Sequence, residues 1–251
     1  MKISKTGYIF LSIGILIISG YLIFSIIQFA DTENETLCTD FHIYYPENSE
    51  LKLVTKEEIA TTLNNAELHP IGEKYKDICG EKIEDEIRKN KLIKKVECFK
   101  TPSGEVYLKV YQRIPLYLIA GNESFYVDTQ KELMPVSLNN ALYVPVASGN
   151  ITMSMAKGEL FDFAKYISEN KFWDSQIEQI YIHPDKTVEL IPRVGDVMIF
   201  FGTLDNFVSK LIKLELLYTQ GFSHIGWDRY EKIDLQHDNQ IVCTLKPKKK
   251  S

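Results

Sequence analysis

Apolar and polar residues divide the chain into one long uncharged run and a series of shorter patterned segments. The run extends from Tyr8 to Ala30, 23 residues. As a helix it is about 35 Å long, enough to cross a bilayer core of about 30 Å. A cleaved signal peptide has a shorter apolar core and small residues at its cleavage site, which "QFA" before Asp31 does not supply. The run therefore predicts a transmembrane helix.

The charges that flank this run indicate its orientation. Lys2 and Lys5 precede it, whereas Asp31, Glu33 and Glu35 follow it. Positively charged residues favour the cytoplasmic side of a membrane helix, so we expect the N-terminus in the cytoplasm. Roughly 220 residues then lie outside, enough for one large or two small domains.

Helix and strand patterns after the run predict a first module. A short strand at 41–45 is followed by a helix in which Thr55 and Glu58 have the spacing of a capping box. A second helix places Ile83 and Ile87 on one face. Two strand-like segments, "LIKKVECF" and "EVYLKVYQR", are separated by a turn at "KTPSG". This order buries one face of a three-stranded sheet against two helices.

A second region combines strands with two amphipathic helices. The segment "GELFDFAKYISEN" has a buried stripe that includes Leu160 and Phe163. Phe161 and Tyr166 fall off this stripe, which leaves room for a partner surface, although core packing explains most of the aromatic residues. A later helix in "LDNFVSKLIKLELLYTQG" is expected to end at Gly221 as a left-handed cap. The strand-like runs are "IEQIYIH", "TVELIP", "DVMIFFG", "EKIDLQH" and "QIVCTL".

Charge and cysteine content narrow the function classes. The formal net charge of −5, without an interleaved pattern of Arg and aromatic residues, argues against a nucleic-acid binder. The basic tail "KPKKKS" is expected to be a solubilising end. Cys38 and Cys79 flank the first module and could be bridged by a disulfide. Cys98 and Cys243 lie in strand-like runs and are expected to be buried small residues.

The sequence shows no catalytic, metal or cofactor motif. The five histidines are scattered, and no pair has the i, i+4 spacing of a helical metal site. Ser223 and His224 in "GFSHIG" lack the spacing of a nucleophile elbow. There is no Gly-rich phosphate loop. We therefore expect no enzyme activity, no cofactor, no metal and no small-molecule substrate.

Two segments of the first module carry a motif, "IEDEIRKNKLIKKVECF" and "VYLKVYQRIPLYLI". Val110, Arg113, Pro115 and Leu116 lie at its characteristic positions, and Gln112 replaces an acidic residue. Together the segments resemble the end of the POTRA domain of FtsQ and DivIB cell-division proteins. POTRA domains also occur in outer-membrane assembly factors, so this resemblance alone does not decide the function.

The second region resembles the β domain of the same family. "FYVDTQKELMP" is similar to the segment that opens this domain, with Lys131 where a turn Gly is usual. "ELIPRVGDVMIFFG" has Arg193, Gly195 and Gly202 in place, and "IDL" at 233–235 is similar to the family's ending. The resemblance implies an α+β fold with a single transmembrane helix, a POTRA module of order β-α-α-β-β and a mixed β domain with an open C-terminal edge strand. The expected divisions are a cytoplasmic tail (1–7), a transmembrane helix (8–30), a POTRA domain (38–114), an FtsQ-type β domain (115–246) and a basic tail (247–251).

The last strand is the candidate binding site. In "QIVCTL" the residues Ile241, Cys243 and Leu245 share one face, opposite Val242 and Thr244. If this strand ends the sheet, its edge is a template for another chain, or an edge that the Lys-rich tail protects. The residues leave both readings open.

The family resemblance favours a binding edge. It implies that a segment of FtsB, or of DivIC in the DivIB branch, adds as a strand and that this partner pairs with FtsL. By motif position the contact residues are His237, Asn239, Gln240, Ile241, Val242 and Leu245. A proline at Val242 is expected to remove one donor of the edge.

The resemblance thus implies a non-catalytic division protein that links septal components. It is expected in the inner membrane at the division septum, with its bulk in the periplasm, because no long extension of the DivIB kind follows the β domain. The alternatives are a membrane-anchored envelope enzyme or sensor, and a POTRA-type chaperone of protein export. An enzyme predicts a deep pocket with convergent polar groups, and a binding protein predicts a flat sheet with an open edge.

Overall fold

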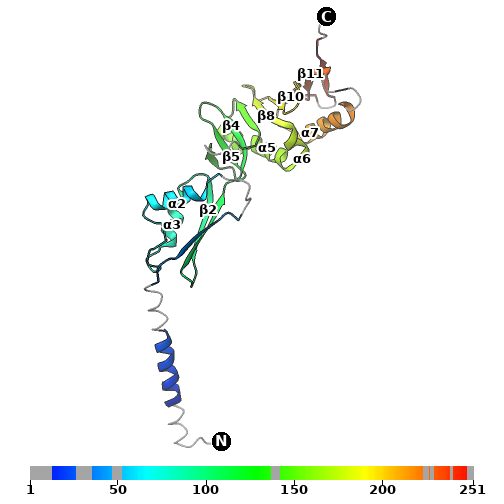
Figure 1. Ribbon diagram of the computed structural model, residues 1–251. Coiled ribbons are helices and arrows are strands. Elements are labelled where there is room, and N and C mark those ends of the chain that lie inside the picture. Colours follow the sequence, from blue (N-terminus) through cyan, green and yellow to red (C-terminus); the bar gives the residue numbers. More distant parts are fainter. Residues whose placement is uncertain are drawn as a thin grey trace, which may run out of the picture. The chain divides into compact units, whose positions relative to one another are not determined.

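The computed structural model describes residues 13–26, 36–46, 53–136, 142–222, 226, 229–237 and 240–247 (Figure 1). The chain divides into two compact units, one ending at Gln112 and one beginning at Arg113. Residues 13–26 are helical. In the described ranges no helix has the length and apolarity needed to cross a membrane, and the ends of the expected 8–30 span lie outside them. The membrane anchor therefore stays a prediction.

The first unit has the expected order of strand, helix, helix, strand, strand (Figure 1). Its sheet has the order β1-β3-β2, with β1 parallel and β2 antiparallel to the central β3. The elements are β1 (Asp40–Tyr44), α2 (Lys56–Asn65), α3 (Gly80–Arg88), β2 (Ile93–Lys100) and β3 (Glu105–Gln112). Since β3 is central, both β1 and β2 are edge strands.

Side-chain hydrogen bonds fix the start of α2 and the segment that leads into it. The Thr55 hydroxyl accepts the Glu58 N–H at 3.1 Å, and the Glu58 carboxylate accepts the Thr55 N–H at 2.8 Å, which confirms the capping box. Gln112 is buried, and its side-chain oxygen accepts the N–H groups of Leu53 and Val54 at 2.8 and 2.9 Å. An amide oxygen satisfies these donors without burying a charge.

The four cysteines are free thiols in the structure. The disulfide expected as a possibility between Cys38 and Cys79 is therefore not formed; Cys38 is buried and Cys79 is exposed. Burial raises the pKa of Cys98 to about 11, which keeps this thiol protonated at neutral pH.

The second unit contains a nine-stranded mixed sheet of order β12-β11-β10-β9-β8-β7-β4-β5-β6. Its first strands are β4 (Pro115–Ala120), β5 (Phe125–Asp128), β6 (Leu133–Pro135) and β7 (Val146–Gly149). The helices are α4 (Met153–Lys157), α5 (Glu159–Glu169), α6 (Lys171–Gln176) and α7 (Phe207–Leu216), the last continued by a π-helical turn, η1 (Leu217–Gly221). The later strands are β8 (Ile177–Ile182), β9 (Val188–Pro192), β10 (Met198–Gly202), β11 (Tyr230–Asp234) and β12 (Val242–Leu245).

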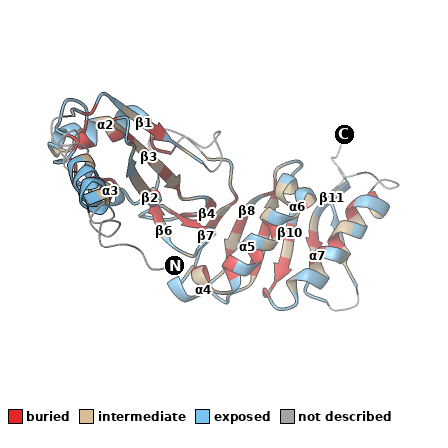
Figure 2. Cartoon of the chain, turned by 90° about the horizontal axis from the view of Figure 1, so that it is seen from below, coloured by how far each residue is buried: buried red, intermediate tan, exposed pale blue. Residues whose placement is uncertain are grey.

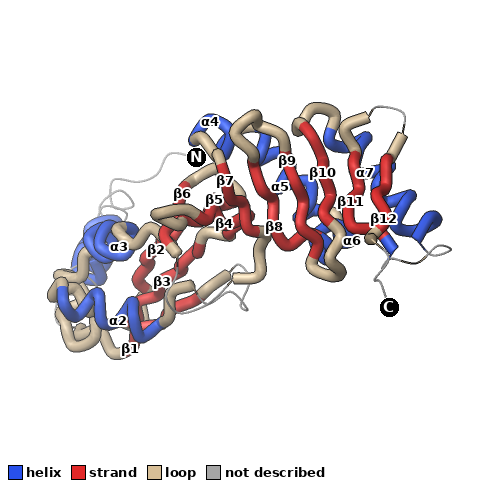
Figure 3. Tube along the Cα trace, turned by 90° about the horizontal axis from the view of Figure 1, so that it is seen from above, coloured by secondary structure: helices blue, strands red, loops and turns tan. Residues whose placement is uncertain are grey.

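The core of this unit lies between the sheet and its helices. Helices α5, α6 and α7 lie against one face, and strands β8 to β12 are unobstructed in the view of the other face (Figure 3). Buried residues, red in Figure 2, follow the strands and the helix sides that meet them. Phe163, Trp173 and Phe201 are fully buried there. One face of the β8–β12 region is therefore packed, and the other is available to solvent.

Core packing accounts for Phe161 and Tyr166, whereas the expected cap at Gly221 is wrong. Phe161 is 4% exposed, with the Lys131 ammonium 4.5 Å from its ring centre, because α5 is covered over more than one stripe. Tyr166 is half-buried and packs edge-on against Phe207 at 5.6 Å. Gly221 is not a left-handed cap, since the chain continues into η1 and the positive φ of +88° falls at Gly226.

Candidate functional site

Strand β12, which the alternating pattern predicts as a strand, forms one edge of the nine-stranded sheet, as the family resemblance implies. It pairs antiparallel with β11, with Val242 opposite Asp234 and Leu245 opposite Tyr230. Within the described residues no strand pairs with its other side. The sheet therefore ends in a strand that has one unpaired edge.

Hydrogen bonds of the neighbouring strands show which way the β12 backbone groups point. The Leu235 N–H donates to the carbonyl of Phe200 at 2.9 Å, so the odd-numbered residues of β11 bond to β10. The even-numbered residues of β11 then bond to β12. At the far end, the Lys246 N–H donates to the carbonyl of Arg229 at 2.8 Å. The hydrogen bonds at both ends of the β11–β12 pair therefore show that the even-numbered residues of β12 bond to β11.

This alternation identifies the backbone groups on the open edge. Val242 and Thr244 bond to β11, whereas the N–H and C=O groups of Cys243 and Leu245 point away from the sheet. The expectation that a proline at Val242 removes an edge donor is therefore wrong, because that N–H belongs to the internal ladder. A proline at Leu245 removes a donor from the open edge instead.

The side chains from Ile241 to Thr244 alternate as predicted, whereas Leu245, expected on the same face as Cys243, is exposed. Ile241 and Cys243 pack against the core, and Cys243 lies opposite the buried Ile233. Val242 is on the open face and is 41% exposed, and Leu245, at the end of the strand, is 58% exposed. Burial raises the pKa of the Cys243 thiol. This thiol is therefore a packing group at neutral pH.

The described members of the expected contact set lie close together in the chain and at one end of the sheet. His237 and Gln240 are exposed in the connection between β11 and β12, and Asn239 falls outside the described residues. Ile241, Val242 and Leu245 lie on or beside β12. Their contact with a partner stays a prediction.

The structure adds a polar and aromatic cluster on the open face next to β12. The Lys232 ammonium lies 4.5 Å from the ring centre of Phe200 and 3.4 Å from the Asp234 carboxylate. The register places Phe200, Asp234 and Val242 in one row across three strands. The register between strands brings these residues together, so the cluster could not be predicted from any local pattern in the sequence.

Helix α7 also exposes an apolar stripe that we did not predict. Leu211 and Leu214 are buried, but Val208, Ile212 and Leu216 are 40%, 51% and 50% exposed. The helix lies against the β10–β12 end of the sheet (Figure 3). The i, i+4, i+8 spacing of the three exposed residues is the signal that could have identified this stripe.

The start of the basic tail is attached to the sheet. The Lys246 ammonium lies 3.8 Å from the Asp196 carboxylate. Residues 248–251 fall outside the described ranges, so protection of the edge by the tail stays an open alternative. Among the residues that the structure describes, no group of three His, Cys, Asp or Glu side chains could hold a metal ion. The described groups at the β12 edge provide backbone hydrogen bonds, apolar contact and ion pairs.

Comparison with known families identifies the second unit. Residues 114–244, which are 131 of the 251 residues, match the model described as FtsQ/DivIB, C-terminal related. The chain belongs to the FtsQ/DivIB family. A POTRA-like domain model matches residues 36–111 of the first unit. No curated protein matches the chain.

Membership in the FtsQ/DivIB family supports a non-catalytic role in cell division. The matched region contains β10, β11 and all but the last residue of β12. Of the two residues on the open edge, Cys243 lies inside the matched region and Leu245 is the first residue after it. The POTRA-like match covers all but the last residue of the three-stranded sheet of the first unit.

Proposed function

We propose that this FtsQ/DivIB-family protein is a single-pass membrane protein of the division septum that binds FtsB- or DivIC-like and FtsL-like partners without catalysis. The observation that carries the proposal is the open edge of β12, where Cys243 and Leu245 present backbone donors and acceptors. An extended partner segment can pair with these groups and become a tenth strand.

Backbone pairing is not sufficient by itself. Two residues with two groups each form about four hydrogen bonds, or about 4 kcal/mol at about 1 kcal/mol net per bond, whereas micromolar affinity needs about 8 kcal/mol. Side-chain contact with Val242 and Leu245, both exposed, supplies part of the difference. A partner held in the same membrane gains effective concentration, which supplies more.

A matched pair of variants at Leu245 tests strand addition. Leu245→Ala removes the exposed side chain and keeps the N–H, whereas Leu245→Pro also removes the N–H. Proline is tolerated on an edge strand where the N–H faces solvent, so the domain is expected to fold. The full chain is solubilised in detergent, and capture of the FtsB- or DivIC-like protein of the same cell is measured by quantitative mass spectrometry.

Strand addition predicts that Leu245→Ala weakens capture modestly and that Leu245→Pro reduces it by about a further fivefold, the effect of losing one backbone hydrogen bond of about 1 kcal/mol. Unchanged tryptophan fluorescence of the second unit verifies that both variants are folded. Equal capture by the alanine and proline variants would contradict pairing at this edge. Capture of neither an FtsB-like nor a DivIC-like protein by the unchanged chain would contradict the proposed partner.

A further inference from the structure

Besides the β12 edge of the second unit, the described residues contain another open sheet edge, at strand β1 of the first unit. The opposite edge strand, β2, contains Lys94, Lys95 and Lys100, and lysines on an edge strand oppose pairing with another chain. Strand β1 contains neither Lys nor Pro. Its described pairing is with β3 alone. The β1 edge therefore lacks the protection that the β2 edge has.

Among the described residues, backbone hydrogen bonds cover this edge only up to the start of β1. The Cys38 N–H donates to the carbonyl of Glu73 at 2.9 Å, and the Gly72 N–H donates to the carbonyl of Cys38 at 3.0 Å. Leu37 and Lys74 form an antiparallel bridge beside them. Within the described residues this cover ends before Asp40. The outer backbone edge of β1, Asp40–Tyr44, is left without a described partner over five residues, and we call this edge the slot.

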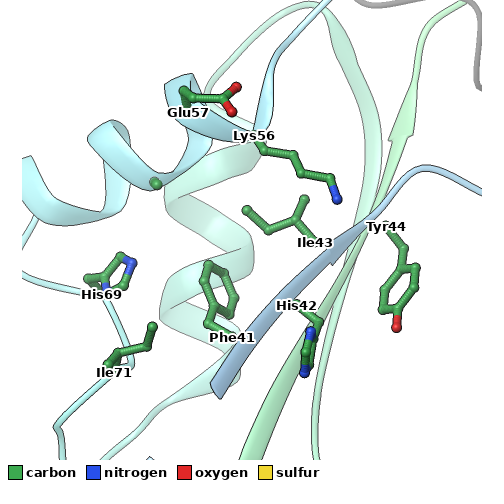
Figure 4. Close-up of a pocket in the computed structure, with 9 residues that line it drawn as sticks. Phe41, His42, Ile43, Tyr44, Lys56, Glu57, His69 and Ile71 are labelled. Carbon is green, nitrogen blue, oxygen red and sulfur yellow. The ribbon is translucent and has the colours of Figure 1, made fainter. Parts of the chain in front are cut away.

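A groove of about 460 Å³ runs along the slot between β1 and the start of α2 (Figure 4). Phe41 and Ile43 point to the helix side of the strand, whereas His42 and Tyr44 point to the opposite side (Figure 4). Lys56 extends from α2 over the groove (Figure 4). The side chains of an added strand that face the helices would enter this groove.

We propose that the slot is filled by β1 of a second copy of this chain, paired antiparallel about a two-fold axis at His42. In this register Phe41 lies opposite Ile43 of the second copy, Asp40 lies opposite Tyr44 of the second copy, and His42 lies opposite itself. The two three-stranded sheets become one six-stranded sheet. Such an interface uses the same surface on both copies and closes as a dimer.

The sequence of β1 is complementary to itself in this register. The two positions on the helix side of β1 are both apolar, so the half-buried Phe41 of each copy packs beside Ile43 of the other (Figure 4). On the other face, the exposed Asp40 carboxylate can accept a hydrogen bond from the exposed Tyr44 hydroxyl. No position places two charges of the same sign opposite each other while His42 is neutral.

Charges at the start of α2 do not oppose the same two-fold arrangement. Lys56 and Glu57 are exposed, line the groove and form no ion pair with another described residue. The two side chains carry opposite charges, so the start of α2 adds no net charge to the surface that the second copy approaches.

Stacked aromatic rings hold Tyr44 in place on the face of the sheet opposite the helices. The rings of Tyr44 and Tyr107 stack with centres 5.8 Å apart, and Tyr107 stacks on Phe99 at 5.5 Å. This row of aromatic rings crosses all three strands of the sheet. Tyr44 is held by the row, so little side-chain freedom is lost when a second copy pairs with it.

Photo-cross-linking of the full chain in phosphatidylglycerol and phosphatidylethanolamine vesicles tests the proposal. The cross-linker p-benzoylphenylalanine replaces Tyr44 in one preparation and Phe99 in a control preparation. The two positions lie in the same aromatic row on opposite edge strands. A cross-linked dimer is expected for position 44, with the adduct mapped near Asp40, and none is expected for position 99.

Charge variants at His42 test the two-fold axis. His42→Lys and His42→Glu each place like charges opposite each other, so each alone is expected to lower the dimer yield at position 44 by about two- to fivefold. A mixture of the two variants is expected to restore the yield, which a variant that fails to fold cannot do. Equal cross-linking at positions 44 and 99, no dimer at any protein density, or no recovery in the mixture would overturn the proposal.

Discussion

Asp128 and Arg113 form a buried ion pair at the start of the second unit. Asp128 is 1% exposed, and its carboxylate accepts an Arg113 N–H at 2.7 Å. The same carboxylate accepts the backbone N–H groups of Gln130 and Glu132, both at 2.8 Å. One side chain therefore neutralises a buried cation and orders the turn between β5 and β6.

Asp128→Ala removes all three hydrogen bonds and leaves the Arg113 guanidinium, whose side chain is 20% exposed, without its counter-charge. Removing one member of a buried pair destabilises a protein by about 3–5 kcal/mol. A domain is stable by about 5–15 kcal/mol in total, so this variant should unfold at a much lower urea concentration. The matched control is Asp162→Ala, because Asp162 is 61% exposed and pairs with Lys131 at 3.7 Å. A surface pair of this kind contributes at most about 1 kcal/mol.

Urea unfolding followed by tryptophan fluorescence measures this difference. Both tryptophans, Trp173 and Trp227, belong to the second unit, so their signal reports on this unit and not on the first. The expected free energy of unfolding falls by about 3–5 kcal/mol for Asp128→Ala and by less than about 1 kcal/mol for Asp162→Ala. A loss below about 1 kcal/mol for Asp128→Ala, or equal losses for both variants, would refute the reasoning.

Three further changes have defined outcomes. The Tyr45 hydroxyl is buried with no described hydrogen-bond partner, so Tyr45→Phe should stabilise the first unit by about 1 kcal/mol, measured by hydrogen exchange. Burial raises the pKa of Tyr45 from 10.0 to about 12, which means that folding favours the neutral phenol. The gain in stability of Tyr45→Phe over the unchanged protein should therefore be constant below pH 10 and should grow as the pH rises from 10 toward 12. Thr55→Ala removes the cap of α2 and should lower the stability of the first unit by about 1 kcal/mol in the same experiment. Val242→Pro should lower the urea midpoint of the second unit more than Leu245→Pro does, because the Val242 N–H belongs to the β11–β12 ladder; equal midpoints would contradict this register.

Much of the fold follows from local patterns. Thr55 and Glu58 predict the capping box, Ile83 and Ile87 predict the buried side of α3, and the alternation in "QIVCTL" predicts β12 and its core-facing Cys243. In each case the residues that determine the structure are close together in the sequence. Hydrophobic spacing is then sufficient.

The remaining features depend on contacts between distant segments. Phe161 is buried because it packs in the core cluster of the second unit, and Lys131, from another part of the chain, lies over its ring. The direction of the Val242 N–H depends on the register of β10 and β11, which a pattern within β12 does not contain. The unprotected edge of β1 likewise follows from the strand order β1-β3-β2. Register and strand order are tertiary properties, so one sequence alone left them open.

Residue-resolved hydrogen exchange of the full chain, alone and in complex with its FtsB- or DivIC-like partner, tests the central claim most directly. If the partner adds a strand at β12, the amides of Cys243 and Leu245 exchange rapidly in the free protein and become protected in the complex. The amides of Val242 and Thr244, already bonded to β11, are protected in both states. Exchange at Cys243 and Leu245 that remains as fast in the complex as in the free protein would contradict strand addition at this edge.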